Sequence, residues 1–159
     1  MNNQFSLNQL TIEKAAQKDW NEILDLLEKT GLKTNFSGNE NFENFFLVKN
    51  NADNHLICCF AIDSENKVGI LKSFAIKKEL QGKGIGKIIV SKIPVLAKDL
   101  KLEKLYAASW EAPDFWEKTI FKKLGLSESK DDYFLNYASY LVKNFSQYSK
   151  QTRHFILEI

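Results

Sequence analysis

Hydrophobic and polar positions follow two different periods along the chain, and the clearest change of period lies between residues 68 and 100. Residues 68–76 form an apolar, partly β-branched run without helical spacing, which predicts a strand. From Ile85 onward the apolar residues return every three or four positions, which predicts an amphipathic helix that ends near Leu100. A polar, glycine-rich turn separates the two segments.

The same patterns predict the other elements of the fold. Apolar runs predict strands at 10–15, 45–49, 55–62, 104–109 and 154–159, with turns at 50–54 and 63–67. Helical spacing predicts one helix capped by Asp19, with Glu22 completing a capping box and Gly31 closing it, and another at 114–124 capped by Asp114. Residues 31–44 are interpreted as a loop with one short helical turn, and residues 131–145 as partly helical. The connection through residues 85–100 predicts that strands 68–76 and 104–109 are parallel.

Length and composition fit one globular domain that covers residues 1–159, with 44% hydrophobic residues. The formal net charge is +2, and no run of five basic residues occurs, so the sequence gives little support for a nucleic-acid partner. There is no apolar run of about 18 residues and no signal-peptide pattern, which predicts a cytoplasmic protein without a membrane partner. Cys58 and Cys59 are adjacent and predicted to be buried, and no metal site is expected.

The turn reads Gln81-Gly82-Lys83-Gly84-Ile85-Gly86-Lys87. Glycine permits positive φ and removes the Cβ that would keep a ligand away from the backbone. The first N–H groups of a helix have no internal partner and lie at the positive end of the helix dipole. Lys83 and Lys87 add positive charge beside them. These properties predict a phosphate-binding turn.

The spacing of the turn decides which kind of phosphate binder it resembles. A P-loop needs a hydroxyl residue after its lysine, but Ile88 follows Lys87, and the dinucleotide fingerprint lacks its third glycine. The pattern that fits is Gln-x-x-Gly-x-Gly, formed by Gln81, Gly84 and Gly86. With the strand before it and the helix after it, this turn resembles the acetyl-CoA motif of the GNAT (GCN5-related) N-acetyltransferases, and the resemblance covers the chain from about residue 10 onward.

The resemblance implies a fold of the α/β (α+β) class, with a mixed, mostly antiparallel central sheet, two splayed parallel strands and flanking helices. It implies acetyl-CoA as co-substrate. The backbone of Phe74, Ala75 and Ile76 would hold the pantetheine and thioester, with Phe74 nearest the acetyl carbonyl as an oxyanion-type donor. The pyrophosphate would be bound by the backbone of Gln81, Gly82, Lys83, Gly84, Ile85, Gly86 and Lys87.

The resemblance also implies the chemistry and where this chain departs from it. A neutral amine attacks the thioester carbonyl, a base takes the ammonium proton, and an acid protonates the leaving thiolate. Many family members carry a tyrosine as that acid, and the aligned position here is Phe121, which has no proton to donate. Branches resembling N-acetylglutamate synthases and arsenic-resistance acetyltransferases also have phenylalanine there. Ser109 and Glu111 are the candidate catalytic residues. The competing interpretations are that Ser109 is only a hydroxyl at the end of a strand and that Glu111 is only a solvated carboxylate in a loop.

The acceptor is indicated by one cation. Lys72 lies on the predicted cofactor strand, where it suits an anionic acceptor such as an amino acid, and Arg153 is a second candidate anion contact; a surface lysine is the competing reading. The leading hypothesis is acetyl transfer to the amine of a small molecule. The alternatives are a protein N-acetyltransferase, a non-catalytic acyl-CoA-binding or sensing module, and a turn that only connects a strand to a helix. A homodimer is left open.

Overall fold

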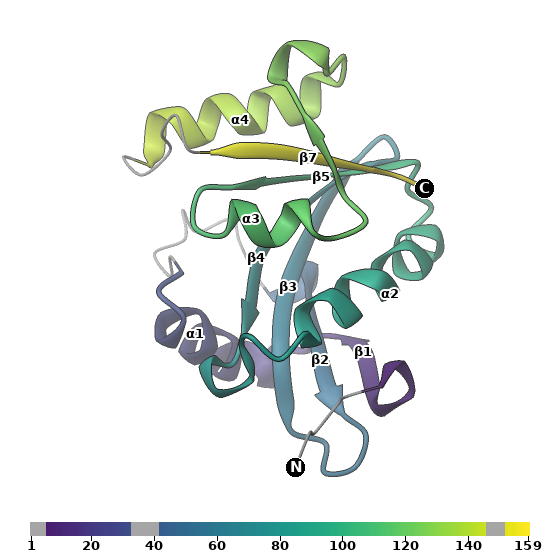
Figure 1. Ribbon diagram of the computed structural model, residues 1–159, viewed down its shortest axis with the longest axis vertical. Helices are drawn as coiled ribbons and strands as arrows, with labels where there is room; N and C mark the ends of the chain where they lie inside the picture. The colour runs from purple at the N-terminus through teal and green to yellow at the C-terminus, as the bar shows by residue number, and fades with distance from the viewer. Residues whose placement is uncertain (1–5, 33–41, 146–151) are drawn as a thin grey trace. The chain divides into compact units, whose positions relative to one another are not determined.

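The computed structural model describes residues 6–32, 42–145 and 152–159. Most of the predicted loop at 31–44 lies outside these ranges. The α-helices are α1 (Trp20–Lys29), α2 (Ile85–Asp99), α3 (Pro113–Glu117) and α4 (Asp132–Asn144). The strands are β1 (Leu10–Lys14), β2 (Phe45–Asn50), β3 (Leu56–Glu65), β4 (Val68–Ile76), β5 (Lys104–Ser109), β6 (Lys122–Leu124) and β7 (Arg153–Glu158) (Figure 1).

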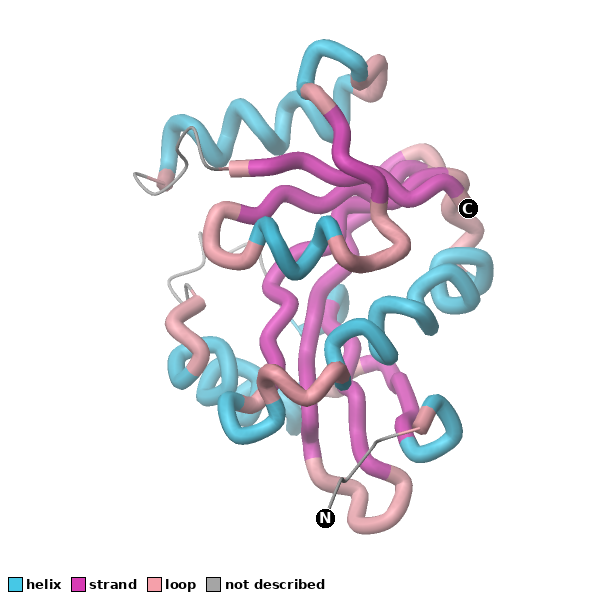
Figure 2. Tube along the Cα trace, in the orientation of Figure 1, coloured by secondary structure: helices cyan, strands magenta, loops and turns pink. Residues whose placement is uncertain are grey.

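The strands are hydrogen-bonded in the order β1-β2-β3-β4-β5-β7-β6. β4 and β5 are parallel, with pairs from Val68–Lys104 to Leu71–Ala107. The pairs β1–β2, β2–β3, β5–β7 and β6–β7 are antiparallel. The predicted mixed, mostly antiparallel sheet with one parallel pair and flanking helices is therefore confirmed. Figure 2 shows the strands and helices along the same trace.

The chain forms two compact units that are interleaved in sequence. The first unit contains residues 1–62 and 72–92, and the second contains residues 63–71 and 93–159. In the first unit, α1 packs its buried residues on one face of the β2–β3 pair. This cluster includes Ile23, Leu27, Phe45, Leu47, Cys59, Ala61 and Ala75. The strands are also buried on their other face, which explains why β2 and β3 read as nearly continuous apolar runs.

In the second unit, the register of β5 on β7 assigns side chains to two faces. Tyr106 pairs with Ile156 and Ala108 with His154, and this face meets α4, where the Phe134 ring stacks on Tyr106 at a centroid distance of 4.2 Å. Phe155 lies on the opposite face and meets α3 through Trp116, with ring centroids 6.5 Å apart. Helices therefore cover both faces of the β5–β7 pair, as α3 and α4 do in Figure 1.

The predicted helix at 114–124 is wrong after its first turn, residues 114–117. α3 begins with Pro113 and ends at Glu117, and Lys122–Leu124 form β6 against β7. The Thr119 hydroxyl donates to the Trp116 carbonyl at 2.7 Å and accepts from the Phe121 N–H at 3.2 Å, which turns the chain out of the helix. Hydroxyl side chains compete with the helical backbone in this way.

Two smaller predictions are also corrected. The Asp19 carboxylate accepts from the Ala16 N–H at 2.8 Å and makes no cap bond to α1, so it closes the preceding turn and forms no capping box with Glu22. The predicted turn at 63–67 is only the pair Asn66 and Lys67, with φ of 48° and 69°. Two consecutive positive φ values are typical of the tightest hairpin connection, so β3 extends to Glu65.

Candidate functional site

The glycine-rich turn lies in the first unit, between β4 and α2. Gly82 and Gly84 have φ of +74° and +80°, values that side chains other than glycine rarely adopt. A Cβ at either position would meet no atom of the chain within 4 Å, so these glycines are required by the backbone conformation and not by crowding. Ile85 begins α2 and is buried, so the last residues of the glycine-rich turn, 85–87, are also the first turn of the helix. The predicted strand at 68–76 and the predicted helix start at Ile85 are confirmed to the residue, and the helix ends at Asp99, one residue before the predicted end.

The end of β4 supplies the other predicted cofactor residues. Ser73 has a φ of +55°, a rare value inside a strand, so the backbone departs from regular strand geometry just before Phe74. The Phe74 ring stacks on Phe60 at 6.0 Å, whereas Ala75 is buried in the cluster beneath α1. β5 pairs with β4 only as far as Leu71, so these four parallel pairs do not include the three predicted cofactor-strand residues.

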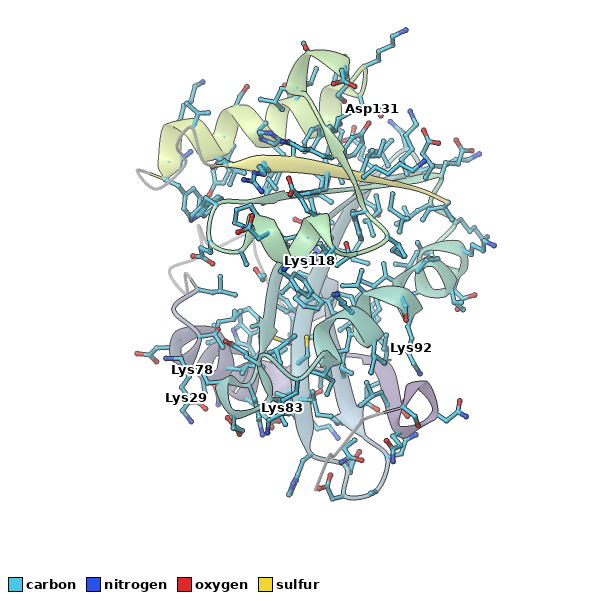
Figure 3. All side chains as sticks on the ribbon, viewed as in Figure 1. Lys29, Lys78, Lys83, Lys92, Lys118 and Asp131 are labelled. Carbon is cyan, nitrogen blue, oxygen red and sulfur yellow. The ribbon has the colours of Figure 1, made fainter. Side chains whose placement is uncertain are left out.

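Cationic and amide side chains border this turn. Lys83 and Lys87 are exposed, and Figure 3 labels Lys83 in the turn and Lys78 in the 3₁₀ segment that precedes it. The Gln81 side-chain amide donates to the Ile76 carbonyl at 2.9 Å. The resemblance assigns the backbone of Ile76 to cofactor binding. In the structure, the carbonyl oxygen of Ile76 accepts a hydrogen bond from Gln81, the glutamine of the same motif. A helix N-terminus with flexible lysines and open space beside two glycines can bind an anion such as a diphosphate.

Residues 12–125 match the sequence profile of the acetyltransferase (GNAT) family. The chain belongs to this family. The predicted resemblance to this family is thus confirmed. A search of curated proteins found no match.

Solved structures similar to this GNAT chain share its fold at low sequence identity. N-acetylglutamate synthase from Neisseria gonorrhoeae, complexed with coenzyme A and N-acetyl-glutamate, has a TM-score of 0.69 and 18% identity over 94% of this chain. The chain spans only 35% of that synthase. A Mycobacterium tuberculosis protein in complex with CoA has a TM-score of 0.68 and 18% identity, covering 94% of this chain and 99% of that one. A GNAT family acetyltransferase from Elizabethkingia anophelis with acetyl-CoA bound has a TM-score of 0.62 and 16% identity, covering 96% and 99%.

Both candidate catalytic residues belong to the second unit of the GNAT chain. Ser109 ends β5, is buried, and its Oγ accepts from the Ala112 N–H at 3.1 Å. This bond closes the turn into α3, so the hydroxyl has an evident structural role. Glu111 is exposed as a residue, but partial burial of its carboxyl raises its pKa. A raised pKa makes the carboxylate a stronger base, in the direction that proton abstraction near neutral pH requires.

Phe121 is a core residue of the second unit. It is 3% exposed, and its ring meets Trp116 edge-on with centroids 5.2 Å apart. Trp116 in turn contacts Phe155 on β7. The side chain at the position of the usual tyrosine therefore packs the α3 face of the sheet.

The two cations assigned to an anionic acceptor lie in different surroundings. Lys72 is half-buried on β4, in the first unit. Arg153 on β7 is engaged by two carboxylates of α3, with Nη1 2.9 Å from Asp114 and 3.0 Å from Glu117. Sequence reasoning missed this pairing because α3 and β7 are far apart along the chain. It also missed the positive φ of Ser73, for which a serine within an apolar strand gives no signal.

Within residues 6–32, 42–145 and 152–159, no group of three or more His, Cys, Asp or Glu side chains is arranged to hold a metal ion. None of the helices in these ranges is long and apolar enough to cross a membrane. Cys58 and Cys59 are buried as predicted, and burial raises the pKa of Cys59 to about 12.

Proposed function

We propose that this GNAT chain transfers the acetyl group of acetyl-CoA to the amine of a small molecule, with a free amino acid or another anionic amine as the acceptor class. The observation that carries the proposal is the turn at Gln81–Lys87, with positive φ at Gly82 and Gly84 and α2 beginning at Ile85. CoA or acetyl-CoA is bound in the similar structures from Neisseria, Mycobacterium and Elizabethkingia. The Neisseria complex also contains N-acetyl-glutamate, which supports an amino-acid acceptor.

In the proposed reaction, the neutral amine nitrogen attacks the thioester carbonyl carbon. The tetrahedral intermediate collapses with cleavage of the C–S bond, which leaves the acetylated amine and the CoA thiolate. The ammonium proton goes to a base and the thiolate takes up a proton, directly or through water. Glu111 is the proposed base and Ser109 a proposed polar contact. Backbone N–H groups at the end of β4 and in the glycine turn would hold the thioester and the pyrophosphate.

A non-catalytic acyl-CoA sensor is the second candidate function. One observation favours it, because the aligned acid position is Phe121, which packs against Trp116 and cannot protonate a thiolate. A protein N-acetyltransferase is the remaining alternative for the acceptor. An acetyltransferase releases free CoA and a sensor does not. The two enzyme proposals differ in the amine that is needed for that release, a small molecule or a protein.

The decisive experiment measures acetyl-CoA binding by calorimetry and then CoA release against free amino acids, other small amines and peptides. Binding with release on an anionic amino acid supports the proposal. Release on peptides alone would replace the acceptor class, and binding without release on any amine would favour the sensor. No binding would overturn the assignment of the turn.

The site itself is tested by the substitution Gly84→Val, with Gly31→Val as a matched control. Gly31 also has a positive φ, +77°, and no atom within 4 Å of a Cβ, but it lies after α1. We expect both variants to lose stability through backbone strain, while only Gly84→Val weakens acetyl-CoA binding, by about tenfold or more. Equal acetyl-CoA affinities in the two folded variants would contradict the site.

A further inference from the structure

The side chain of Gln81 makes a hydrogen bond that its assignment to the glycine turn does not explain. Its amide Nε2 donates to the carbonyl of Ile76, five residues earlier, at 2.9 Å. Ile76 is the last residue of β4, and Gln81 is the first residue of the turn that precedes α2. The bond therefore joins the end of the strand directly to the start of the turn.

The residues between these two points form a compact connection. Lys77 donates its N–H to Ile57 on β3 at 3.0 Å, which fixes the strand end to the sheet. Leu80 donates to Lys77 at 2.9 Å, and Gln81 itself donates through its backbone to Lys78 at 3.2 Å, so the connection is one 3₁₀ turn. The Gln81 side chain closes this turn across its base.

Beyond Gln81 the backbone is less constrained by its own residue types. Gly82 and Gly84 have the widest range of allowed φ and both are exposed. The positive φ values of Gly82 and Gly84 set the orientation of the N–H groups that follow them. A shift of the backbone at Gln81 would therefore change the orientation of those N–H groups. An anchor at Gln81 limits that change.

We propose that Gln81 is a positioning residue, whose amide holds the glycine turn at a fixed distance and orientation from the end of β4. This inference rests on the proposed function, in which the strand end holds the pantetheine and the turn holds the pyrophosphate of one acetyl-CoA molecule. A ligand that must reach both subsites at once gains affinity from their fixed spacing. Glutamine suits this role because it has an N–H donor and the length to reach Ile76.

The test compares acetyl-CoA with its two halves, S-acetylpantetheine and 3′-phosphoadenosine 5′-diphosphate (3′-phospho-ADP), in wild type, Gln81→Met and Gln81→Asn. Methionine has the length of glutamine but no donor, and asparagine has the donor but is one methylene shorter. We expect each variant to weaken acetyl-CoA binding by about tenfold while changing the affinity of each half by less than about twofold, because only the coupling between subsites is lost. Melting temperatures close to wild type are expected, since Gln81 is exposed.

Three results would overturn the inference. Unchanged acetyl-CoA affinity in Gln81→Met would show that the anchor is dispensable, with the proposed function intact. Loss of 3′-phospho-ADP affinity equal to the loss of acetyl-CoA affinity would show that the glutamine contacts the diphosphate directly. Absence of acetyl-CoA binding in wild type would remove the proposed function itself, and the inference with it.

Discussion

At the scale of single residues, two helices of the chain end in the same hydrogen-bonded turn. After α1, the Leu32 N–H donates to the Leu27 carbonyl at 2.9 Å and the Gly31 N–H donates to the Glu28 carbonyl at 3.0 Å. These six-to-one and five-to-two bonds define the Schellman motif, in which the penultimate residue is left-handed. Gly31 meets that requirement with a φ of +77°.

The end of α2 has the same two bonds but a different residue at the left-handed position. The Leu102 N–H donates to the Ala97 carbonyl at 2.9 Å, and the Lys101 N–H donates to the Lys98 carbonyl at 2.9 Å. Lys101 therefore takes the place of Gly31 and has a φ of +59°. A side chain with a Cβ is strained in this conformation.

We predict that Lys101→Gly stabilises the chain. Relief of the left-handed strain exceeds the extra entropy of glycine in the unfolded state, so the free energy of unfolding should rise by about 0.5–1 kcal/mol. Urea denaturation followed by circular dichroism measures the change. The neighbouring exposed Lys98→Gly is the control, and it should destabilise because Lys98 lies inside α2. A loss of stability in Lys101→Gly would show that its left-handed φ is not a source of strain.

Residue types predict some of these conformations and hide others. Glycine favours a positive φ at turns and helix ends, and Gly31, Gly82 and Gly84 each have one. Ser73 and Lys101 adopt the same region without any such signal, since neither residue type prefers it. The glycine turn of the candidate site was therefore predictable from the sequence, whereas the irregularity in β4 beside it was not.

At the scale of elements, the start of α4 is joined to β5 by a polar cluster. The hydroxyl of Tyr106, which is 1% exposed, donates to the Asp131 carboxylate, and Lys104 Nζ lies 3.2 Å from the same oxygen. Ser129 Oγ lies 3.3 Å from the Tyr106 hydroxyl. Figure 3 labels Asp131 in the second unit, directly before α4. This cluster satisfies the hydroxyl of a tyrosine whose ring is otherwise in the core.

We predict that Asp131→Ala lowers the free energy of unfolding by about 1–3 kcal/mol at pH 7, because it leaves the Tyr106 hydroxyl without its acceptor. The hydrogen bond from Tyr106, helped by Lys104, lowers the pKa of Asp131 below its ordinary value of 3.8. The stability from this carboxylate is therefore fully present above that ordinary value and is lost as the pH falls through the lower folded pKa. As the pH falls from 7 toward 3, the difference between variant and wild type should stay constant until the pH approaches 3.8 and shrink below that value.

The neighbouring aspartate provides the control for this prediction. Asp132 is exposed in the first turn of α4, so Asp132→Ala should cost less than about 1 kcal/mol. Urea titrations of the three proteins across this pH range give the comparison. An equal loss in the two variants, or a difference that is constant with pH, would contradict the role assigned to the Asp131 carboxylate.

Elements were predictable from the sequence where one period dominates. β4 and β5 agree with prediction to the residue, and the apolar spacing of α2 continues through Pro94 to Asp99. The segment 114–124 misled because Phe115, Trp116 and Phe121 fit a helical spacing, although Thr119 ends the helix and Lys122–Leu124 join β7. Pairing with a strand some thirty residues later is a tertiary effect that no local period contains.

At the scale of the whole molecule, the chain forms two compact units that could unfold either together or separately. The chain passes between the units after Ile62, Leu71 and Lys92. β3, β4 and α2 therefore each contribute residues to both units. Neither unit is a continuous segment, and each shared strand would have to break for one unit to unfold alone. We propose, as the sequence predicted, that residues 1–159 behave as a single domain.

This proposal predicts one cooperative transition that core substitutions in either unit shift as a whole. Leu27 in the first unit and Leu105 in the second are both fully buried, so Leu27→Ala and Leu105→Ala should each cost about 2–5 kcal/mol. Scanning calorimetry should give equal calorimetric and van't Hoff enthalpies for wild type and both variants, as a two-state domain requires. Two separate transitions, of which Leu27→Ala lowers one and Leu105→Ala the other, would instead show two domains. The shared strands argue against that result. If one unit unfolded alone, β3 and β4 would lose their hydrogen-bonded neighbours along part of their length, which would also destabilise the part that stays folded.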